Sequence, residues 1–336
     1  MLFESLSLET LGNIYIGVFG LAVLLYAILD GYDLGVGILL PPRHEPFRDT
    51  MISSIGPYWD ANETWLVLAV GILLFAFPDA HNRFLQTLYL PATFMLLGLI
   101  MRGVSFDFRA KVAQVKKRKW DLSFKYGSLV VTLTQGYMLG IYVTGLRTDL
   151  WAQGFALLSA VGVSAAYAFI GSCWLILKTE GELQEKAFKW AKRGLLALAL
   201  GISAVSLANL TLHDDVREMW LSAPTGYYLA AIPIACFILL SGCAVSLKKL
   251  PEYKGRADWL PFAIALVVFS LCFAAFAISY YPYVVPGEMT IQDAISSADS
   301  LRFLLVGIVI VVPCILAYTL LVYRIFAGKA EALTYY

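Results

Sequence analysis

Long apolar runs separated by short polar connections dominate the pattern of this chain. A helix needs about 20 apolar residues to cross a hydrocarbon core roughly 30 Å thick, and most of the runs reach or approach this length. The pattern therefore predicts an all-α integral membrane protein that crosses the bilayer about nine times, as a single polytopic membrane domain over residues 1–336. The expected spans lie near residues 11–31, 59–77, 85–101, 123–144, 151–177, 194–212, 227–247, 259–281 and 303–326.

Composition agrees with this class and argues against a nucleic-acid partner. The chain is 60% hydrophobic and 15% charged, with a mean hydropathy of +0.73, which a bilayer-embedded bundle requires. A net charge of +1 creates no global field, so we expect no nucleic-acid partner. All five cysteines fall inside apolar runs without a CxxC pair, which favours small packed side chains over disulfides or a metal site.

Basic residues accumulate in alternate connections. Of the 25 lysines and arginines, 21, including Lys254, lie in or beside the first, third, fifth and seventh connections and the C-terminal tail. The other connections and the N-terminus are rich in acidic residues. Because short loops with many positive charges stay on the cytoplasmic side, the sequence predicts an external N-terminus and a cytoplasmic C-terminus.

Two acidic motifs interrupt this apolar pattern. The segment AILDGYDLGVG places Asp30 and Asp33 at i and i+3 near the cytoplasmic end of the first span, and PYWDANETWL places Asp60 and Glu63 likewise at the start of the second. Asn62 lies between the latter pair. An ionisable group in a span costs a few kcal/mol at least, which makes each one a candidate functional residue. The two motifs lie at the same depth, so the four carboxylates could converge around one point and pass protons inward.

Structural explanations for the same residues stay open. Asp60 and Glu63 could cap the N-terminus of their helix, and Asp33 could be a solvated residue at the boundary. Arg102, which ends the third span, is explained equally by the positive-inside bias or by a specific contact. Trp59 and Trp65 lie at or near predicted boundaries, where indole rings anchor helices at the headgroup level.

The histidines argue against a redox centre in this chain alone. His44, His81 and His213 all fall in predicted connections, whereas a bundle that holds its own haem usually needs His, Met or Cys ligands that face each other. No Walker A, GxGxxG or HExxH pattern is found either. We therefore expect neither a metal nor a cofactor bound by this chain.

Five segments in a fixed order carry a resemblance to a known family. They are LDGYDLGVG from Leu29, GPYWDANETWL from Gly56, RGVSFDFRAK from Arg102, YPYVVPG from Tyr281 and DAISS from Asp293. This order resembles subunit II of the cytochrome bd ubiquinol oxidases from the first span to the ninth, and the length resembles the shorter, cyanide-insensitive branch. The departures are modest: Ala61, where glycine is frequent, and Glu63, where Gln or Glu occurs.

The resemblance implies a fold, a complex and a location. The fold would be two four-helix bundles plus one peripheral helix, in the bacterial inner membrane. Subunit I would be the partner and would carry two haems b, one haem d and the ubiquinol site, while this chain carries none. Some members add a small single-span subunit, and membrane lipids or quinone are further expected partners. The complex would oxidise ubiquinol and reduce dioxygen to water.

The resemblance also implies roles for individual residues. At matching positions, Asp30, Asp33 and Asp60 would belong to a proton path from the cytoplasm towards subunit I, with Glu63 beside them. Trp65 and the nearby Trp59, Asn62 and Arg102 would lie on an oxygen access route or at the subunit interface. Two rival functions remain open, namely a proton-coupled secondary transporter and a scaffold whose acidic residues only cap helices and hold subunit I.

Overall fold

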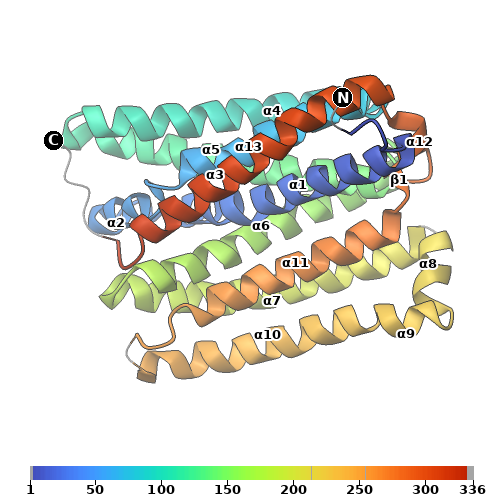
Figure 1. The fold of residues 1–336 in the computed structure, drawn as a ribbon. Coiled ribbons are helices and arrows are strands. Elements are labelled where there is room, and N and C mark those ends of the chain that lie inside the picture. Colours follow the sequence, from blue (N-terminus) through green and yellow to red (C-terminus); the bar gives the residue numbers. More distant parts are fainter. Residues whose placement is uncertain (1–2, 213, 254, 331–336) are drawn as a thin grey trace.

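The protein is a bundle of long helices. The computed structural model describes residues 3–212, 214–253 and 255–330, so His213 and Lys254 lie outside the described residues. Long helices lie side by side through the whole molecule, and only a small hairpin departs from helical structure (Figure 1). The all-α class predicted from the apolar pattern is confirmed.

A long helix occupies each of the nine predicted ranges. They are α1 (Leu8–Leu39), α3 (Trp59–Ala76), α4 (Pro78–Lys111), α5 (Gln114–Val143), α6 (Leu150–Lys178), α7 (Gly181–Leu212), α10 (Ala231–Lys249), α11 (Leu260–Tyr280) and α13 (Ala298–Ile325).

Short elements connect these helices. They are α2 (Glu45–Ile55), α8 (Asp214–Leu221), α9 (Thr225–Leu229), the 3₁₀ helix η1 (Leu250–Tyr253), α12 (Ile291–Ala294) and the antiparallel strands β1 (Tyr283–Val285) and β2 (Met289–Thr290). Apart from α9, which overlaps the start of the span predicted at 227–247, none of these elements was expected from the apolar pattern, because each is too short to cross a bilayer.

Several helices continue well beyond the predicted spans. The basic segments before 123 and before 194 were expected to be connections, yet α5 begins at Gln114 and α7 at Gly181. Lysine and arginine are good helix formers, so these basic segments do not end the helix. Within the described residues, eight helices are long and apolar enough to cross a membrane. The exception among the nine is α5, whose first half is basic.

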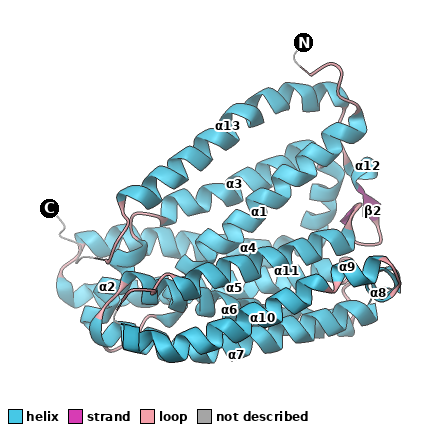
Figure 2. Ribbon diagram, turned by 60° about the horizontal axis from the view of Figure 1, so that its bottom comes forward, coloured by secondary structure: helices cyan, strands magenta, loops and turns pink. Residues whose placement is uncertain are grey.

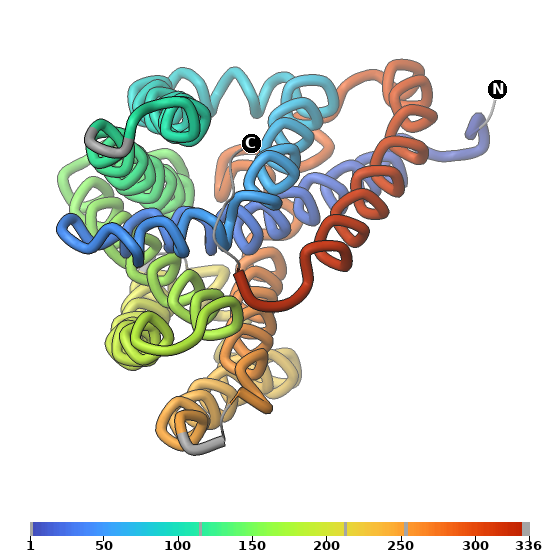
Figure 3. The backbone as a smooth tube through the Cα atoms, turned by 90° about the vertical axis from the view of Figure 1, so that its left-hand side faces the viewer, coloured from blue at the N-terminus to red at the C-terminus, as the bar shows by residue number. Residues whose placement is uncertain are grey.

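The helices form two groups of four. One group contains α1, α3, α4 and α5, and the other contains α6, α7, α10 and α11. The groups meet where α6 packs along both α5 and α1, and α13 lies at the side, against α1 and α3 (Figure 3). Figure 2 shows α13 crossing its neighbours obliquely. This arrangement agrees with two four-helix bundles and one peripheral helix.

A close helix crossing joins the two groups. A Cβ atom added to Gly35 of α1 would lie 1.8 Å from the carbonyl oxygen of Tyr167 in α6, and one added to Gly171 would lie 2.6 Å from the backbone of Gly35. Small residues of this kind let helix backbones approach closely inside a bilayer. The crossing lies directly beside the acidic motif of α1, which is therefore enclosed between the two groups.

Candidate functional site

Two acidic residues lie in the interior of helix α1. Asp30 and Asp33 are both fully buried, and the helix continues for almost two more turns to Leu39. The helix thus continues beyond residue 31, where the sequence placed the end of the span. Gly31 and Gly35 face Tyr167 of α6, so these glycines allow the two helices to pack closely. Asp33 is therefore not a solvated boundary residue of the chain.

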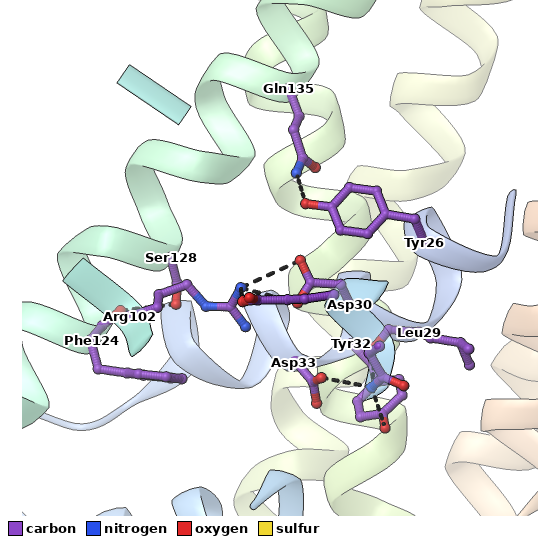
Figure 4. Close-up of polar contacts among 11 residues, drawn as sticks. Tyr26, Leu29, Asp30, Tyr32, Asp33, Arg102, Phe124, Ser128 and Gln135 are labelled. Atoms are coloured by element: carbon purple, nitrogen blue, oxygen red, sulfur yellow. Dashed lines mark hydrogen bonds and ion pairs between the residues drawn. The ribbon is translucent and has the colours of Figure 1, made fainter. Parts of the chain in front are cut away.

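Arg102 joins acidic residues from two other helices. Its Nη1 atom lies 3.0 Å from Asp30 Oδ1 and 3.1 Å from Glu63 Oε1, so one guanidinium of α4 bridges α1 and α3 (Figure 4). Its side chain is fully buried, and the ring of Phe124 lies 5.6 Å from the guanidinium carbon. A solvated loop arginine would show none of these contacts. Arg102 therefore makes a specific contact, one of the two explanations that the sequence left open.

Asn62 connects the second acidic residue of α1 to two tyrosines. Its Nδ2 donates to Asp33 Oδ2 at 2.7 Å and to the Tyr32 hydroxyl at 3.0 Å. The Tyr323 hydroxyl lies 2.6 Å from that of Tyr32 and donates to Asn62 Oδ1 at 3.3 Å. Three helices, α1, α3 and α13, thus share one polar network in an otherwise apolar region.

The charges in this site do not balance. Three carboxylates, those of Asp30, Asp33 and Glu63, surround one guanidinium. Moving unpaired charge out of water costs several kcal/mol per ion, so the group approaches neutrality only when it also holds protons. Among the described residues, Asp33 Oδ1 has no hydrogen-bond partner, and neither do Nε and Nη2 of Arg102. The arrangement is suited to binding and releasing protons.

The polar column continues from Asp30 towards the middle of the bundle. The Nε2 atom of Gln135 in α5 donates to the Tyr26 hydroxyl at 2.6 Å, one turn before Asp30 on α1 (Figure 4). The Oε1 atom of Gln135 has no partner among the described residues. Polar atoms therefore extend beyond the carboxylates into the depth of the first group of helices.

The remaining predicted residues lie at different depths. Asp60 is exposed in the first turn of α3 and does not join the buried carboxylates. Trp59 is half-buried against Phe106, whereas Trp65 is fully buried beside α1. The N-cap residue of α3 is Tyr58, whose side chain makes no cap hydrogen bond, and Asp60 lies in the first turn, where a carboxylate complements the helix dipole. Glu63 pairs with Arg102, and the dipole role of Asp60 stays a prediction.

The histidines and cysteines do not gather into a ligand set. His44 precedes α2 and stacks on Phe47 with ring centroids 3.7 Å apart. His81 lies in the first turns of α4, so its predicted place in a connection was wrong. Within the described ranges, no group of three or more His, Cys, Asp or Glu residues is placed to hold a metal ion, and the cysteines are free.

Sequence reasoning missed the tyrosines and the glutamine of this site. Tyr32 lies inside the first motif, but Tyr26, Gln135 and Tyr323 are distributed over three spans and were not predicted to belong to the site. Tyr32 and Tyr323 are 291 residues apart along the chain, and only the packing of α13 on α1 brings them together. The one available signal was Gln135, an amide side chain in an apolar span.

Comparisons with known proteins agree over nearly the whole chain. A family profile described as cytochrome bd terminal oxidase subunit II matches residues 11–326. Cytochrome bd ubiquinol oxidase subunit 2 of Bacillus subtilis is 27% identical over 335 residues, covering 92% of this chain and 95% of that protein. Cytochrome bd-I ubiquinol oxidase subunit 2 of Escherichia coli is also 27% identical, over 354 residues, covering 93% of each.

A solved structure shares the fold. A chain of the bd oxidase from Geobacillus thermodenitrificans aligns with a TM-score of 0.75 at 20% sequence identity, covering 95% of this chain and 100% of that chain. Structural likeness at this level of identity shows the common arrangement of helices.

Proposed function

The chain belongs to the family of cytochrome bd terminal oxidase subunit II, and from this premise we propose that its buried carboxylates carry protons from the cytoplasm to the oxidase. The protein is a multi-pass subunit of a quinol oxidase in the bacterial inner membrane, with subunit I as its partner. The family places the haems in that partner and makes ubiquinol the substrate. The transporter alternative is not favoured.

The reaction of the complex creates a need for such a path. Reduction of one dioxygen to two waters takes up four protons, and oxidation of quinol releases protons. If the consumed protons come from the cytoplasm and the released ones leave outside, a membrane potential develops without a pump. Protons that reach the partner from the cytoplasm must cross part of the apolar core, where water is scarce and ionisable side chains are the available carriers.

The observation that carries the proposal is the full burial of Asp30 and Asp33 around a single arginine. Arg102 Nη1 contacts both Asp30 and Glu63, so it stabilises whichever of them is ionised. A proton that moves from Asp30 to Glu63 leaves the total charge of these three residues unchanged. Such a transfer avoids the large electrostatic cost of moving a lone charge through the bundle.

Glu63 and Asp60 are proposed to hand protons to the partner. The Glu63 side chain is 26% exposed, and Asp60 lies three residues earlier on the same face of α3. They thus lead from the buried site to the outer surface of this chain, where subunit I would cover them. Trp65, buried just behind, would serve an internal oxygen route and not a surface contact.

The finer composition of the complex belongs to the same proposal. Subunit I would carry two haems b and one haem d, and a single-span accessory subunit and bound lipids or quinone would complete the complex. The oxidase would belong to the cyanide-insensitive branch. The predicted orientation, with the N-terminus outside, places the carboxylates near the cytoplasm.

Carboxylate-to-amide variants of the whole complex test the proposal. We expect Asp30→Asn and Asp33→Asn to slow oxygen consumption by tenfold or more, a modest share of the roughly 10²–10⁴-fold that a positioned acid or base contributes, with normal haem content. Asp299→Asn, which changes a side chain that is 96% exposed, is the matched control. Wild-type turnover in both buried variants would overturn the proposal, and loss of haem from the purified complex would favour a structural scaffold instead.

A further inference from the structure

A pocket opens at the end of the bundle that is predicted to face the cytoplasm. Its volume is about 330 Å³, enough for several water molecules. It lies between the C-terminal ends of α6 and α13 and the start of α11, and its exposed rim includes Gly255, Ala327 and Gly328. Tyr58 and Trp174 form a buried floor. We call this cavity the Tyr323 pocket, because the ring of Tyr323 forms part of its wall.

The wall of the Tyr323 pocket is also the outer end of the site network. The Tyr323 hydroxyl is 2.6 Å from the Tyr32 hydroxyl, and Tyr32 accepts a hydrogen bond from Asn62 at 3.0 Å. The same Asn62 nitrogen donates to Asp33 at 2.7 Å. A hydrogen-bonded path of two hydroxyls and one amide therefore joins a surface cavity to a carboxylate that bulk water does not touch.

We propose that the Tyr323 pocket is the port through which cytoplasmic water delivers protons to Asp33, by way of the Tyr323 and Tyr32 hydroxyls. This inference rests on the proposed function and identifies the place where protons enter the path. A hydronium ion in the pocket gives a proton to the Tyr323 oxygen and becomes water, while Tyr323 turns its own hydroxyl hydrogen from Asn62 to the Tyr32 oxygen. In the same concerted step Tyr32 turns and releases its hydrogen to the Asp33 carboxylate. One proton has moved, and both hydroxyl groups are restored.

The chemistry of the three linking residues supports this assignment. A tyrosine hydroxyl is both a donor and an acceptor, as a proton relay requires. The Asn62 amide nitrogen only donates, so Asn62 acts as a positioning residue that holds Tyr32 beside Asp33. Charges elsewhere in the pocket are already engaged: Lys329 pairs with Asp258 at 2.7 Å, and Lys178 donates to Tyr58 and to the Phe326 carbonyl.

Removal of one hydroxyl tests the relay in the assembled oxidase. We expect Tyr323→Phe to slow proton uptake by about tenfold or more when the reduced complex meets oxygen, with unchanged haem content. Uptake is followed with a pH-indicator dye in a single turnover. The matched control is Tyr15→Phe, because the Tyr15 hydroxyl on α1 likewise makes a buried hydrogen bond between α1 and α13, to the Leu301 carbonyl, but near the other end of the helix. It should keep wild-type uptake.

A second variant blocks the port after assembly, in case Tyr323→Phe fails to fold. Ala327→Cys on the exposed rim is labelled with a bulky, membrane-impermeant maleimide, which should slow uptake to a similar extent. The unsubstituted complex, treated in the same way, is the control.

The outcomes separate the port from the proposed function. Wild-type uptake in Tyr323→Phe and in labelled Ala327→Cys, with slow uptake in Asp30→Asn and Asp33→Asn, would overturn the port and leave the carboxylate path standing. Wild-type uptake in all four would overturn both. Equal slowing in Tyr15→Phe and Tyr323→Phe would also overturn the port, because it would show a general effect of loosening α13.

Discussion

At the residue scale, Arg102 decides the electrostatics of the site. Among the described residues it is the only cation that pairs with the carboxylates of the site, and it contacts the buried Asp30 and the partly exposed Glu63 through the same nitrogen atom. A buried ion pair contributes little net stability, but removal of one partner leaves the other charge uncompensated. Arg102 is therefore expected to matter for assembly as well as for proton transfer.

Replacement of Arg102 by an apolar residue tests this expectation. We predict that Arg102→Met destabilises the protein by about 3–5 kcal/mol, because Asp30 is left without its cation in the bundle interior. The measurement is the thermal midpoint of the purified complex and its haem content. Asp30→Asn introduced into the Arg102→Met background should recover part of the loss. If Arg102→Met alone is as stable as the wild type, the role assigned to Arg102 is contradicted.

At the element scale, the crossing of α1 and α6 holds the two groups of helices together. Gly35→Ala would place a methyl group 1.8 Å from the Tyr167 carbonyl oxygen, so the helices would have to separate. We predict strongly reduced recovery of haem-containing complex from membranes. Gly17→Ala on the same helix is the control, since a Cβ atom there would meet nothing within 4 Å. Equal yields of the two variants would show that the crossing is not required.

The N-terminus of α6 depends on one carboxylate outside the spans. Asp149 accepts hydrogen bonds from the backbone of Ala152 and Trp151 and lies 2.8 Å from Arg147; the Ala152 bond contributes most to lowering its pKa. A lowered pKa means that this stabilisation is present above the ordinary carboxyl pKa of about 3.9 and is lost only as the pH falls through the lowered value.

Two substitutions at Asp149 separate capping from charge. We predict that Asp149→Ala lowers the thermal midpoint of the complex by the same amount at pH 5.5 and pH 8, because Asp149 is ionised at both. Asp149→Asn should keep most of the stability, since asparagine caps a helix nearly as well. A destabilisation by alanine that disappears at pH 5.5 would contradict the low pKa.

At the scale of the whole molecule, the outer surface suits a bilayer. Many large apolar side chains face outward, among them Val67 of α3, Phe237 of α10 and Phe303 of α13, each more than 70% exposed. A soluble monomer rarely shows such continuous apolar surface. The second group of helices and α13 cover the sides of α1. They shield its two carboxylates, Asp30 and Asp33, from the surroundings of the protein.

Orientation is a property of the whole molecule and has a direct test. The distribution of lysine and arginine predicts that a fluorescent protein fused after the last residue folds in the cytoplasm and fluoresces. Alkaline phosphatase fused within the loop between α5 and α6, after Arg147, should be active because that loop is expected outside. Activity of phosphatase at the C-terminus instead would reverse the orientation and move the Tyr323 pocket to the outer face.

The amino-acid sequence by itself determined the class of the protein, its apolar helices and the first and second acidic motifs. Helix-length apolar runs and rare charges within them are local features, so their physical cost can be read without a fold. The five ordered segments that resemble the family are also local features, so they could be recognised without a fold. The partners of Arg102 were not local, and the sequence left its role undecided between loop charge and specific contact.

Only the tertiary structure decided which polar groups meet. Asp30, Glu63 and Arg102 come from three helices, and Tyr323 joins Tyr32 from the far end of the chain. Asp60 resembles Glu63 in the sequence but lies exposed. Helix rotation and crossing determine these positions, and both depend on side-chain packing between distant segments, which a linear pattern of apolar and polar residues does not encode.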